Sequence, residues 1–557
     1  MNSKIFSVLL LLASITVSSN AQVWLNPYNG QSNSDDKGYG IVVDRAGNVY
    51  TSGYTTNDTS GIDVILIKYN NSGALQWRSV YKGTGYNTDK PIGIVIDNND
   101  NIYICGYTTR TGGNIDYLTV KFNSSGTQQW AKLYNGTSNG EDRAWGIIVD
   151  NSGNVFVTGT SAATSSGKNC VTIKYNSAGN EVWVKSFDGP SHKDDAGMSI
   201  VKDANNNIYV GGYGKFTSSN YNDYLLIKYN SGGTEQWVKN YNGNASGEDR
   251  AWGIVIDNSD NIYITGSSLA EIGKTDIVTL KYNSAGQVLW TSRFNSPEGH
   301  DDNAFGIAVD NVTGSTYVIG TTETNNHGLD FVTLRYNNSN GSQLWNKTFD
   351  GVGHSDDIPY SLAISHSEAN PHIFVAGTTR HGTNQQSEDI AVISYSSSGI
   401  VLSSTVYDGS ANLDDAAFGI AVDVNDNYFI SGYIGVQGTL NSMVPSHDMV
   451  TVKYNKLNLI GIVKIENNIP ENYKLYQNYP NPFNPSTKIK FDLASESDVK
   501  LSVFDITGKE VGVLLNNKLA AGSYEISFNN INLSSGIYFY RLNTGSYSEI
   551  KKMTLIK

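Results

Sequence analysis

The sequence predicts an all-β protein that is built mainly from one repeated unit, and three observations lead to this prediction. Glycine (56) and tyrosine (35) are frequent among the 557 residues, which suits short strands joined by tight turns. Apolar residues occur in short runs bounded by Asn, Asp and Gly, as they do in strands. The segment EDRAWGIIVDNSGNVFVTGTS at Glu141–Ser161 returns almost unchanged at Glu248–Ser268.

The first residues predict a secretory signal peptide, residues 1–21, that is not part of the fold. A positive charge at Lys4 precedes the apolar run IFSVLLLLASITV, and small residues then favour cleavage after Ala21. The run is too short to span a bilayer, and no later segment reaches about 18 continuous apolar residues. We therefore expect export and no transmembrane segment.

The repeated unit occurs eight times within residues 22–455. The first copy predicts strands at Gly40–Asp44, Val49–Tyr54, Val64–Tyr69 and Leu75–Tyr81, joined by Asn/Asp/Gly hairpin loops. Four strands in a period of about 53 residues predict the blade of a β-propeller. The residue that closes the first strand marks the period, at Asp44, Asp97, Asp150, Asp203, Asp257, Asp310, Ser365 and Asp423.

The chain start is predicted to complete the last blade. The fourth strand carries Trp in the first six copies and Ser403 in the seventh, whereas the eighth copy ends after Tyr454 without a fourth strand. The mature N-terminus QVWLNPYNG matches EQWVKNYNG of Glu235–Gly243, so Trp24 fits the missing strand. An N-terminal strand would close a ring of eight blades and leave no open edge within it.

These residues resemble the SBBP repeat, a family of secreted bacterial β-propeller repeats. The matching pieces are GI-x-V-D…GN-(I/V)-Y-(V/I)-x-G and D-x-x-T-x-K-Y-N-x-x-G-x-x-x-W, from Trp24 to about Asn455. The family implies a propeller without a settled activity. It is usually described as seven-bladed, so seven blades stand as the alternative to eight.

A second domain is predicted over residues 474–557, after a linker at 456–473. Strands with period-2 alternation, such as Val499–Asp505, Tyr524–Phe528 and Gly536–Leu542, indicate a small Ig-like β-sandwich. The stretch is similar to the type A C-terminal sorting domain of the type IX secretion system through NYPNPFNPST, Asp505–Val511 and the final KKMTLIK. The resemblance implies the type IX machinery as a partner and a product that is released or fixed to the cell surface. A plain Ig-like module is the alternative.

An aspartate recurs just before every first strand. First strands line the central channel of a propeller, so eight carboxylates would ring its mouth, on the face with the longer loops. We favour a structural role, in which each accepts backbone N–H groups and locks one blade to the next. A metal site for Ca²⁺ is the alternative, and otherwise no cofactor is expected. The residues are Asp36, Asp89, Asp142, Asp195, Asp249, Asp302, Asp357 and Asp415.

A cation recurs in the third strand of seven copies. The seventh copy loses this cation (Ser394), the strand-one Asp (Ser365) and the Trp (Ser403) together. We therefore hypothesise that Asp and Lys pair within a blade, as Asp150 with Lys174. The cations are Lys68, Lys121, Lys174, Lys228, Lys281, Arg335 and Lys453.

The cysteines, two tryptophans and several histidines are predicted to have structural rather than functional roles. Cys105 and Cys170 are expected to be buried free thiols rather than a disulfide. Trp145 and Trp252 are predicted to be core rather than a sugar platform. Four histidines stand beside acidic residues but belong to different copies, which disfavours a shared metal site; they are His192, His300, His354 and His447.

The function predicted from these features is non-catalytic. No nucleophile elbow, zinc helix or phosphate loop is present, and a net charge of −13 disfavours nucleic acid as a partner. We expect a secreted or cell-surface binding or display protein, with polysaccharide or a surface or matrix protein as ligand. One alternative is an enzyme that cleaves glycans or peptides with acidic residues of the channel mouth, although eight similar carboxylates make poor acid–base pairs. The other is a purely structural surface protein.

Overall fold

The computed structural model describes residues 22–556 with short gaps, and the predicted signal peptide lies outside the described residues. The chain divides into two compact units, Val23–Leu457 and the part from Asn458 onward, and each is described by itself. None of the described residues forms a helix long and apolar enough to cross a membrane. The gaps are 85–86, 165–166, 218–220, 271–272, 298, 325–327, 352, 366–370, 381–386, 410, 438–444, 456–462, 467–469, 485, 520 and 530–532.

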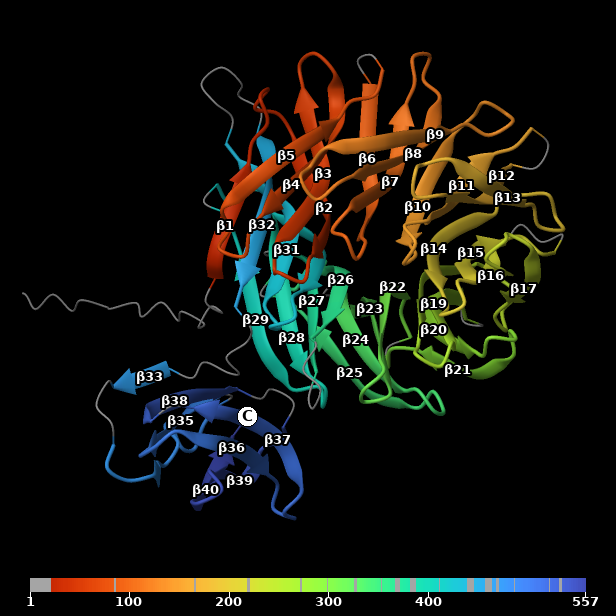
Figure 1. Ribbon diagram of the computed structural model, residues 1–557. Coiled ribbons are helices and arrows are strands. Elements are labelled where there is room, and N and C mark those ends of the chain that lie inside the picture. The colour runs from red at the N-terminus through yellow and green to blue at the C-terminus, as the bar shows by residue number, and fades with distance from the viewer. Residues whose placement is uncertain are drawn as a thin grey trace, which may run out of the picture. The chain divides into compact units, whose positions relative to one another are not determined.

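The first unit is a propeller in which the described residues form eight blades of four antiparallel strands (Figure 1). A short parallel pairing of Gly61 and Ile62 with Asn87 and Thr88 joins the sheets of blades 1 and 2. Blade 1 comprises β2 (Asp36–Val43), β3 (Val49–Asn57), β4 (Gly61–Tyr69) and β5 (Leu75–Tyr81), and blade 2 comprises β6 (Asn87–Ile96), β7 (Ile102–Thr109), β8 (Ile115–Phe122) and β9 (Gln128–Tyr134). Blade 3 comprises β10 (Asp142–Val149), β11 (Val155–Ala162), β12 (Lys168–Tyr175) and β13 (Glu181–Phe187), and blade 4 comprises β14 (Ala196–Lys202), β15 (Ile208–Gly214), β16 (Asp223–Tyr229) and β17 (Glu235–Tyr241). Blade 5 comprises β18 (Asp249–Ile256), β19 (Ile262–Leu269), β20 (Thr275–Tyr282) and β21 (Val288–Phe294), and blade 6 comprises β22 (Asp302–Asp310), β23 (Ser315–Thr324), β24 (Gly328–Asn337) and β25 (Gln343–Phe349). Blade 7 comprises β26 (Ile358–Ile364), β27 (His372–Arg380), β28 (Glu388–Ser396) and β29 (Val401–Tyr407), and blade 8 comprises β30 (Ala416–Val422), β31 (Tyr428–Val436), β32 (Ser446–Tyr454) and β1 (Gln22–Tyr28).

The ring closes as the sequence predicts. The last blade has the strand order β1-β32-β31-β30, so the N-terminal strand is its outer strand. The first strand of each blade contacts the first strand of the next, from β2 around to β30 and back to β2. The eight first strands therefore surround the axis, and the fourth strands lie at the rim. This confirms the prediction of eight blades.

The two middle strands of each blade form the core because neighbouring blades cover both of their faces. In β3 the seven residues from Val49 to Thr55 are all buried, and β4 is buried over most of its length. The hairpin loops follow from Asp side chains. Asp44 Oδ1 accepts the N–H groups of Ala46 (3.0 Å) and Asn48 (2.8 Å), and Gly47 takes a positive φ of 78°.

Every first strand carries a β-bulge at the same place. In blade 3 the register with β11 shifts between Ala144 and Gly146, which leaves Trp145 as the extra residue. The equivalent shift occurs in all eight blades, so one large side chain per blade stands at a bulge: Tyr39, Ile92, Trp145, Met198, Trp252, Phe305, Tyr360 and Phe418. Six of these eight side chains are aromatic.

The second unit consists of two four-stranded antiparallel sheets around one core. The sheets have the orders β33-β38-β35-β34 and β37-β36-β39-β40, and their buried cluster includes Phe491, Val503, Ile526, Tyr540 and Met553. This agrees with the predicted small sandwich, while an Ig-like topology stays a prediction. The strands are β33 (Val463–Glu466), β34 (Lys474–Leu475), β35 (Ser486–Leu493), β36 (Ser497–Phe504), β37 (Glu510–Leu519), β38 (Gly522–Asn529), β39 (Gly536–Asn543) and β40 (Ser548–Leu555).

The two cysteines are buried free thiols, as predicted. Cys105 lies in β7 and Cys170 in β12, and both side chains are fully buried. Burial raises the pKa of each thiol to about 12, so neither forms a reactive thiolate near neutral pH.

Candidate functional site

The eight predicted aspartates lie at the junctions between blades and act there as hydrogen-bond acceptors. Each carboxylate accepts the backbone N–H of the residue six positions upstream, in the segment that arrives from the preceding blade: Gly30, Gly83, Gly136, Gly189, Gly243, Ser296, Gly351 and Gly409. The other oxygen of Asp142 accepts the N–H of Ala162 at 3.0 Å, and that of Asp195 accepts Lys215 N–H at 3.2 Å. One side chain thus joins the incoming segment to the end of the second strand.

These latch aspartates are buried, with at most 1% of each exposed. Burial is the largest influence on their pKa and raises it above the ordinary aspartate value for Asp36, Asp89, Asp249 and Asp302. It raises the pKa of Asp195, Asp357 and Asp415 to about 6. Their similar surroundings suit a repeated structural role, whereas acid–base catalysis needs two carboxylates in unlike surroundings.

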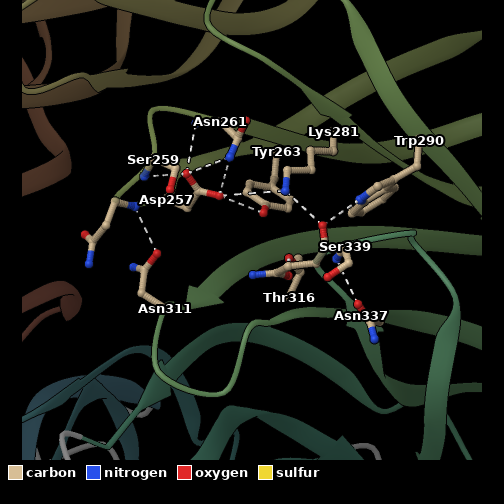
Figure 2. Close-up of polar contacts among 12 residues, drawn as sticks. Asp257, Ser259, Asn261, Tyr263, Lys281, Trp290, Asn311, Thr316, Asn337 and Ser339 are labelled. Carbon is tan, nitrogen blue, oxygen red and sulfur yellow. Dashed lines mark hydrogen bonds and ion pairs between the residues drawn. The ribbon is translucent and has the colours of Figure 1, made fainter.

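The recurring third-strand cation contacts the next blade, which corrects the hypothesis of Asp–Lys pairs within a blade. Lys174 Nζ donates to Ser231 O of blade 4 at 3.0 Å. Lys281 Nζ donates to Asn338 O of blade 6 at 2.8 Å, and Trp290 Nε1 donates to the same oxygen at 3.1 Å (Figure 2). Among the described residues, an ion pair between this cation and the strand-one aspartate occurs only for Lys281 and Asp257, at 3.8 Å.

The Trp side chain of this clamp also needs a glycine in the next blade. A Cβ atom added to Gly341, which has a φ of 72°, would lie 2.6 Å from the Trp290 ring. The same relation holds between Trp24 and Gly73 and between Trp77 and Gly126. We call the cation, the Trp and the hairpin carbonyl that both contact the Lys–Trp clamp. It links one blade to the next near the rim.

Near the axis, the aromatic residues at the bulges are only partly buried. Phe305 and Tyr360 are 39% and 36% exposed, and Trp145 and Trp252 are half-buried, so the prediction that these two tryptophans are core is wrong. The rings of Tyr360 and Phe418 are 4.9 Å apart, and those of Phe418 and Tyr39 are 5.3 Å apart. A continuous aromatic row therefore runs across blades 7, 8 and 1.

A second set of aromatic and charged groups lies at the junctions between blades. At four junctions a tyrosine of the second strand lies beneath a cation of the next first strand: Tyr433 and Lys37 (4.0 Å), Tyr54 and Lys90 (4.6 Å), Tyr107 and Arg143 (4.5 Å), Tyr213 and Arg250 (5.0 Å). At the other four junctions both partners change together, to Thr160 and Ala196, Ser267 and Asn303, Thr321 and Ile358, and Thr378 and Ala416.

A small polar pocket lies where one such pair is missing. It has a volume of about 210 Å³, and Thr160 and Ala196 line it together with Lys168, Asp194 and Arg250. Trp145 Nε1 lies 3.4 Å from Thr160 Oγ1, and the Trp252 ring lies 6.2 Å from the ring of Tyr213, which also lines the pocket. The pocket thus combines groups of both charges with two nearby indoles.

The four predicted histidines each pair with an acidic residue at a separate place. The pairs are His192 with Asp188 (2.9 Å), His300 with Glu323 (3.7 Å), His354 with Asp350 (2.6 Å) and His447 with Asp35 (2.8 Å). In the described part of the chain, the groups of three that could hold a metal consist of aspartates alone.

Sequence reasoning missed both the tyrosine–cation pairs and the Lys–Trp clamp. A signal for the first was available, because tyrosine and Lys or Arg occur together or are absent together when the eight copies are aligned. The clamp left a weaker signal, the joint loss of Lys and Trp in the seventh copy. That loss was assigned to a contact within the blade.

The fold places the protein in a class, the repeat β-propellers, and a second small domain follows the propeller in sequence. Residues 28–58 match the family model of the SBBP beta-propeller repeat, and residues 477–557 match that of the secretion system C-terminal sorting domain. The chain thus carries SBBP-type repeats and a type IX sorting tail. It is a secreted or cell-surface protein that interacts with the type IX secretion machinery.

Solved structures with similar folds are distant in sequence. One is PorZ, a surface component of the type IX secretion system of Porphyromonas gingivalis (13% identity, TM-score 0.33, 93% of this chain and 74% of that chain). Another is the quinohemoprotein alcohol dehydrogenase of Comamonas testosteroni (11%, 0.46, 82% and 78%), and a third is the WD40 domain of fission yeast SCAP (11%, 0.40, 78% and 94%). A search of curated proteins finds no significant match. None of these likenesses supports an inference about function.

Proposed function

We propose that the protein is a non-catalytic recognition propeller at the cell surface, and that its ligand is a polysaccharide bound at the inner ring of the variable-loop face. The observation that carries the proposal is the row of Tyr360, Phe418 and Tyr39, which offers partly exposed rings in sequence across three blades. Aromatic faces stack on the apolar faces of sugars, while neighbouring polar groups bind the hydroxyls.

Basic and acidic side chains lie beside this aromatic row. Lys37 lies over the ring of Tyr433, and that ring is 5.8 Å from Phe418. His447 pairs with Asp35, and its ring lies 4.6 Å from that of Tyr433. Such a mixture favours a neutral or weakly charged sugar chain over a strongly charged ligand, because a cation and a carboxylate both lie beside the aromatic row.

The latch aspartates support the non-catalytic part of the proposal. Their carboxylates hold backbone N–H groups and are buried, so they are poorly placed to meet a substrate. An enzyme remains the second candidate because of the pocket beside Trp145. There Asp194 and Asp195 line one cavity, and burial raises the pKa of Asp195 to about 6.

The test is a binding assay on the mature full chain, immobilised and exposed to a panel of polysaccharides. We expect saturable binding without cleavage products, and a loss of affinity of about twofold to tenfold for Tyr360→Ala, since one aromatic contact is worth ~0.5–1.5 kcal/mol. Val312→Ser serves as the control, because Val312 is 66% exposed on a first hairpin loop at the opposite end of the blade.

Two outcomes contradict the proposal. Equal affinity of wild type and Tyr360→Ala for every bound polysaccharide places the site elsewhere. Cleavage products that vanish in Asp194→Asn identify the pocket as an active site and the protein as an enzyme.

A further inference from the structure

Three carboxylates converge at the junction between blades 6 and 7. Asp330 lies in the third strand of blade 6, Asp350 directly follows its fourth strand, and Asp357 is the latch aspartate of blade 7. One oxygen of each lies within 4.8 Å of an oxygen of both others. Asp330 and Asp357 are 2% and 0% exposed, whereas Asp350 is exposed, so the cluster is open to solvent on one side.

One of the two buried carboxylates has an oxygen that the protein does not satisfy. Asp330 Oδ2 accepts the Thr324 hydroxyl at 2.7 Å, whereas its Oδ1 is buried and has no hydrogen-bond partner among the residues that the structure describes. Asp357 is better satisfied, because Gly351 N–H (2.5 Å), the Thr379 hydroxyl and the backbone of Arg380 donate to it. A buried carboxylate oxygen without a partner is costly, and it indicates a ligand that completes the site.

Three other blades of the same chain neutralise the third-strand aspartate with a cation. In blade 1 the equivalent of Asp330 is Asp63, and the equivalent of Asp350 is Lys82, whose Nζ lies 3.9 Å from Asp63. In blade 5 the equivalent is Asp276, which pairs with Arg293 at 2.7 Å. Arg110 pairs with Asp116 in the same way in blade 2.

Blade 6 has a carboxylate where blade 1 has the cation. Asp350 replaces Lys82, and Thr348 stands at the position of Arg293. His354 is the nearby group able to carry positive charge, with Nδ1 2.6 Å from Asp350, but its side chain is 59% exposed and is charged only when protonated. No Lys or Arg among the described residues forms an ion pair with this cluster, and a cation from solution can supply the missing positive charge.

We propose that Asp330, Asp350 and Asp357 bind a divalent cation of the calcium class. Calcium takes carboxylate oxygens at about 2.3–2.6 Å, so two of its ligands lie at most ~5 Å apart, which the cluster satisfies. Water on the side of Asp350 completes the coordination. The following junction also brings three aspartates together, Asp389, Asp408 and Asp415, but there both oxygens of Asp415 accept backbone N–H groups, from Gly409 and Gly435, so we propose no second ion. Of the predicted acidic ring, Asp357 thus serves as both latch and ligand.

The experiment is calorimetric titration of the EDTA-treated mature protein with CaCl₂, together with thermal unfolding in CaCl₂ and in EDTA. We expect about one ion per chain and a melting temperature that rises by several degrees with calcium, because the ion binds the folded state alone. Asp350→Lys copies the cation of blade 1. It should lose the bound ion while its melting temperature in EDTA does not fall below that of the wild type.

A matched control is Asp188→Lys, since Asp188 occupies the same position before blade 4, where Asn169 replaces the third-strand aspartate. This variant should keep the ion. If Asp350→Lys does not fold, Asp350→Asn takes its place and should also lose the ion. An unchanged melting temperature of the wild type in calcium overturns the proposal, as does full calcium binding by the Asp350 variants.

Discussion

Trp24 and Lys453, from opposite ends of the propeller sequence, donate hydrogen bonds to the same carbonyl oxygen of Asn71. Trp24 Nε1 lies 3.2 Å from this oxygen and Lys453 Nζ lies 3.0 Å from it. Blade 8 is therefore joined to blade 1 by the same Lys–Trp clamp that links other neighbouring blades, although its two donors come from opposite ends of the propeller sequence. The clamp makes the junction between the termini chemically equivalent to most others.

This closure predicts a measurable coupling between Trp24 and Lys453. Trp24→Ala should lower the free energy of unfolding by about 2–3 kcal/mol, because a half-buried indole is lost, and Lys453→Met by about 1 kcal/mol. The double variant should deviate from additivity by ~0.5 kcal/mol or more, since both donors share one acceptor. Urea unfolding of the four proteins measures the cycle. Strict additivity would show that the two ends close the ring independently.

The loss of the clamp in blade 7 has a structural reason that a graft can test. Blade 8 takes its fourth strand from the N-terminus, so it has no hairpin between third and fourth strands to accept a Trp and a Lys. Ser394 and Ser403 contact each other instead, at 2.6 Å between hydroxyls.

We expect the double substitution Ser394→Lys with Ser403→Trp to destabilise the protein by at least ~1 kcal/mol, because the buried cation gains no acceptor. Trp345→Ser in blade 6 should cost about 2–4 kcal/mol, since that blade does face a hairpin. Thermal and urea unfolding compare the two. A graft that raises stability would favour plain sequence divergence as the cause of the loss.

Two glycines with positive φ separate backbone strain from the contact with Trp. Gly73 has a φ of 85°, and a Cβ there would lie 2.6 Å from Trp24; Gly314 has a φ of 63° and no atom within 4 Å of such a Cβ. Gly314→Ala should cost about 1 kcal/mol from strain alone. Gly73→Ala should cost about 2–4 kcal/mol, because the indole must also move. Equal losses in chemical denaturation would mean that the Trp ring adjusts freely.

The latch at Asp195 predicts a pH effect with a defined sign. Burial, followed by the charges of Asp188 and Asp194, raises the pKa of Asp195 in the folded protein to about 6, above its ordinary value of 3.8. The folded state then binds the proton more tightly, so this group's contribution to stability falls as pH rises from about 4 to about 6 and is constant above pH 7.

The test compares wild type with Asp195→Asn, which cannot titrate. The stability of the wild type relative to the variant should be greater at pH 5 than at pH 7.5, by ~1–2 kcal/mol in urea unfolding. A difference that is the same at both pH values, or that is larger at pH 7.5, would contradict a raised pKa.

Much of the fold was predictable because repetition supplies eight copies of each local signal. The hairpins follow from Asp, Asn and Gly, and the strand carried by Trp24 could be assigned from its likeness to the other fourth strands. The prediction of where each first strand begins was less accurate. The first strand of blade 1 was predicted from Gly40, whereas β2 begins at Asp36, because the bulge at Tyr39 interrupts the alternation of the strand.

The candidate site was less predictable, because a sequence pattern does not tell contacts within a blade from contacts between blades. The sequence pattern predicts a pair of Asp150 and Lys174 within one blade, yet Lys174 Nζ donates a hydrogen bond to Ser231 O of the next blade. Trp145 was assigned to the core because other copies carry apolar residues there. A β-bulge turns this position out of the core, and a bulge leaves little trace in the sequence. The acidic trio needed three-dimensional coordinates, since its members come from separate segments.

The shared last blade also makes the fold sensitive to whether the chain is whole. A product that stops before β32 leaves β1 without a partner and blade 1 without its neighbour, and both expose strand edges. Open edges attract other strands and lead to aggregation, whereas the complete ring has none at this junction. A complete chain thus differs from a truncated one in having its strand edges paired at this junction, and this difference does not depend on recognition of the sorting tail.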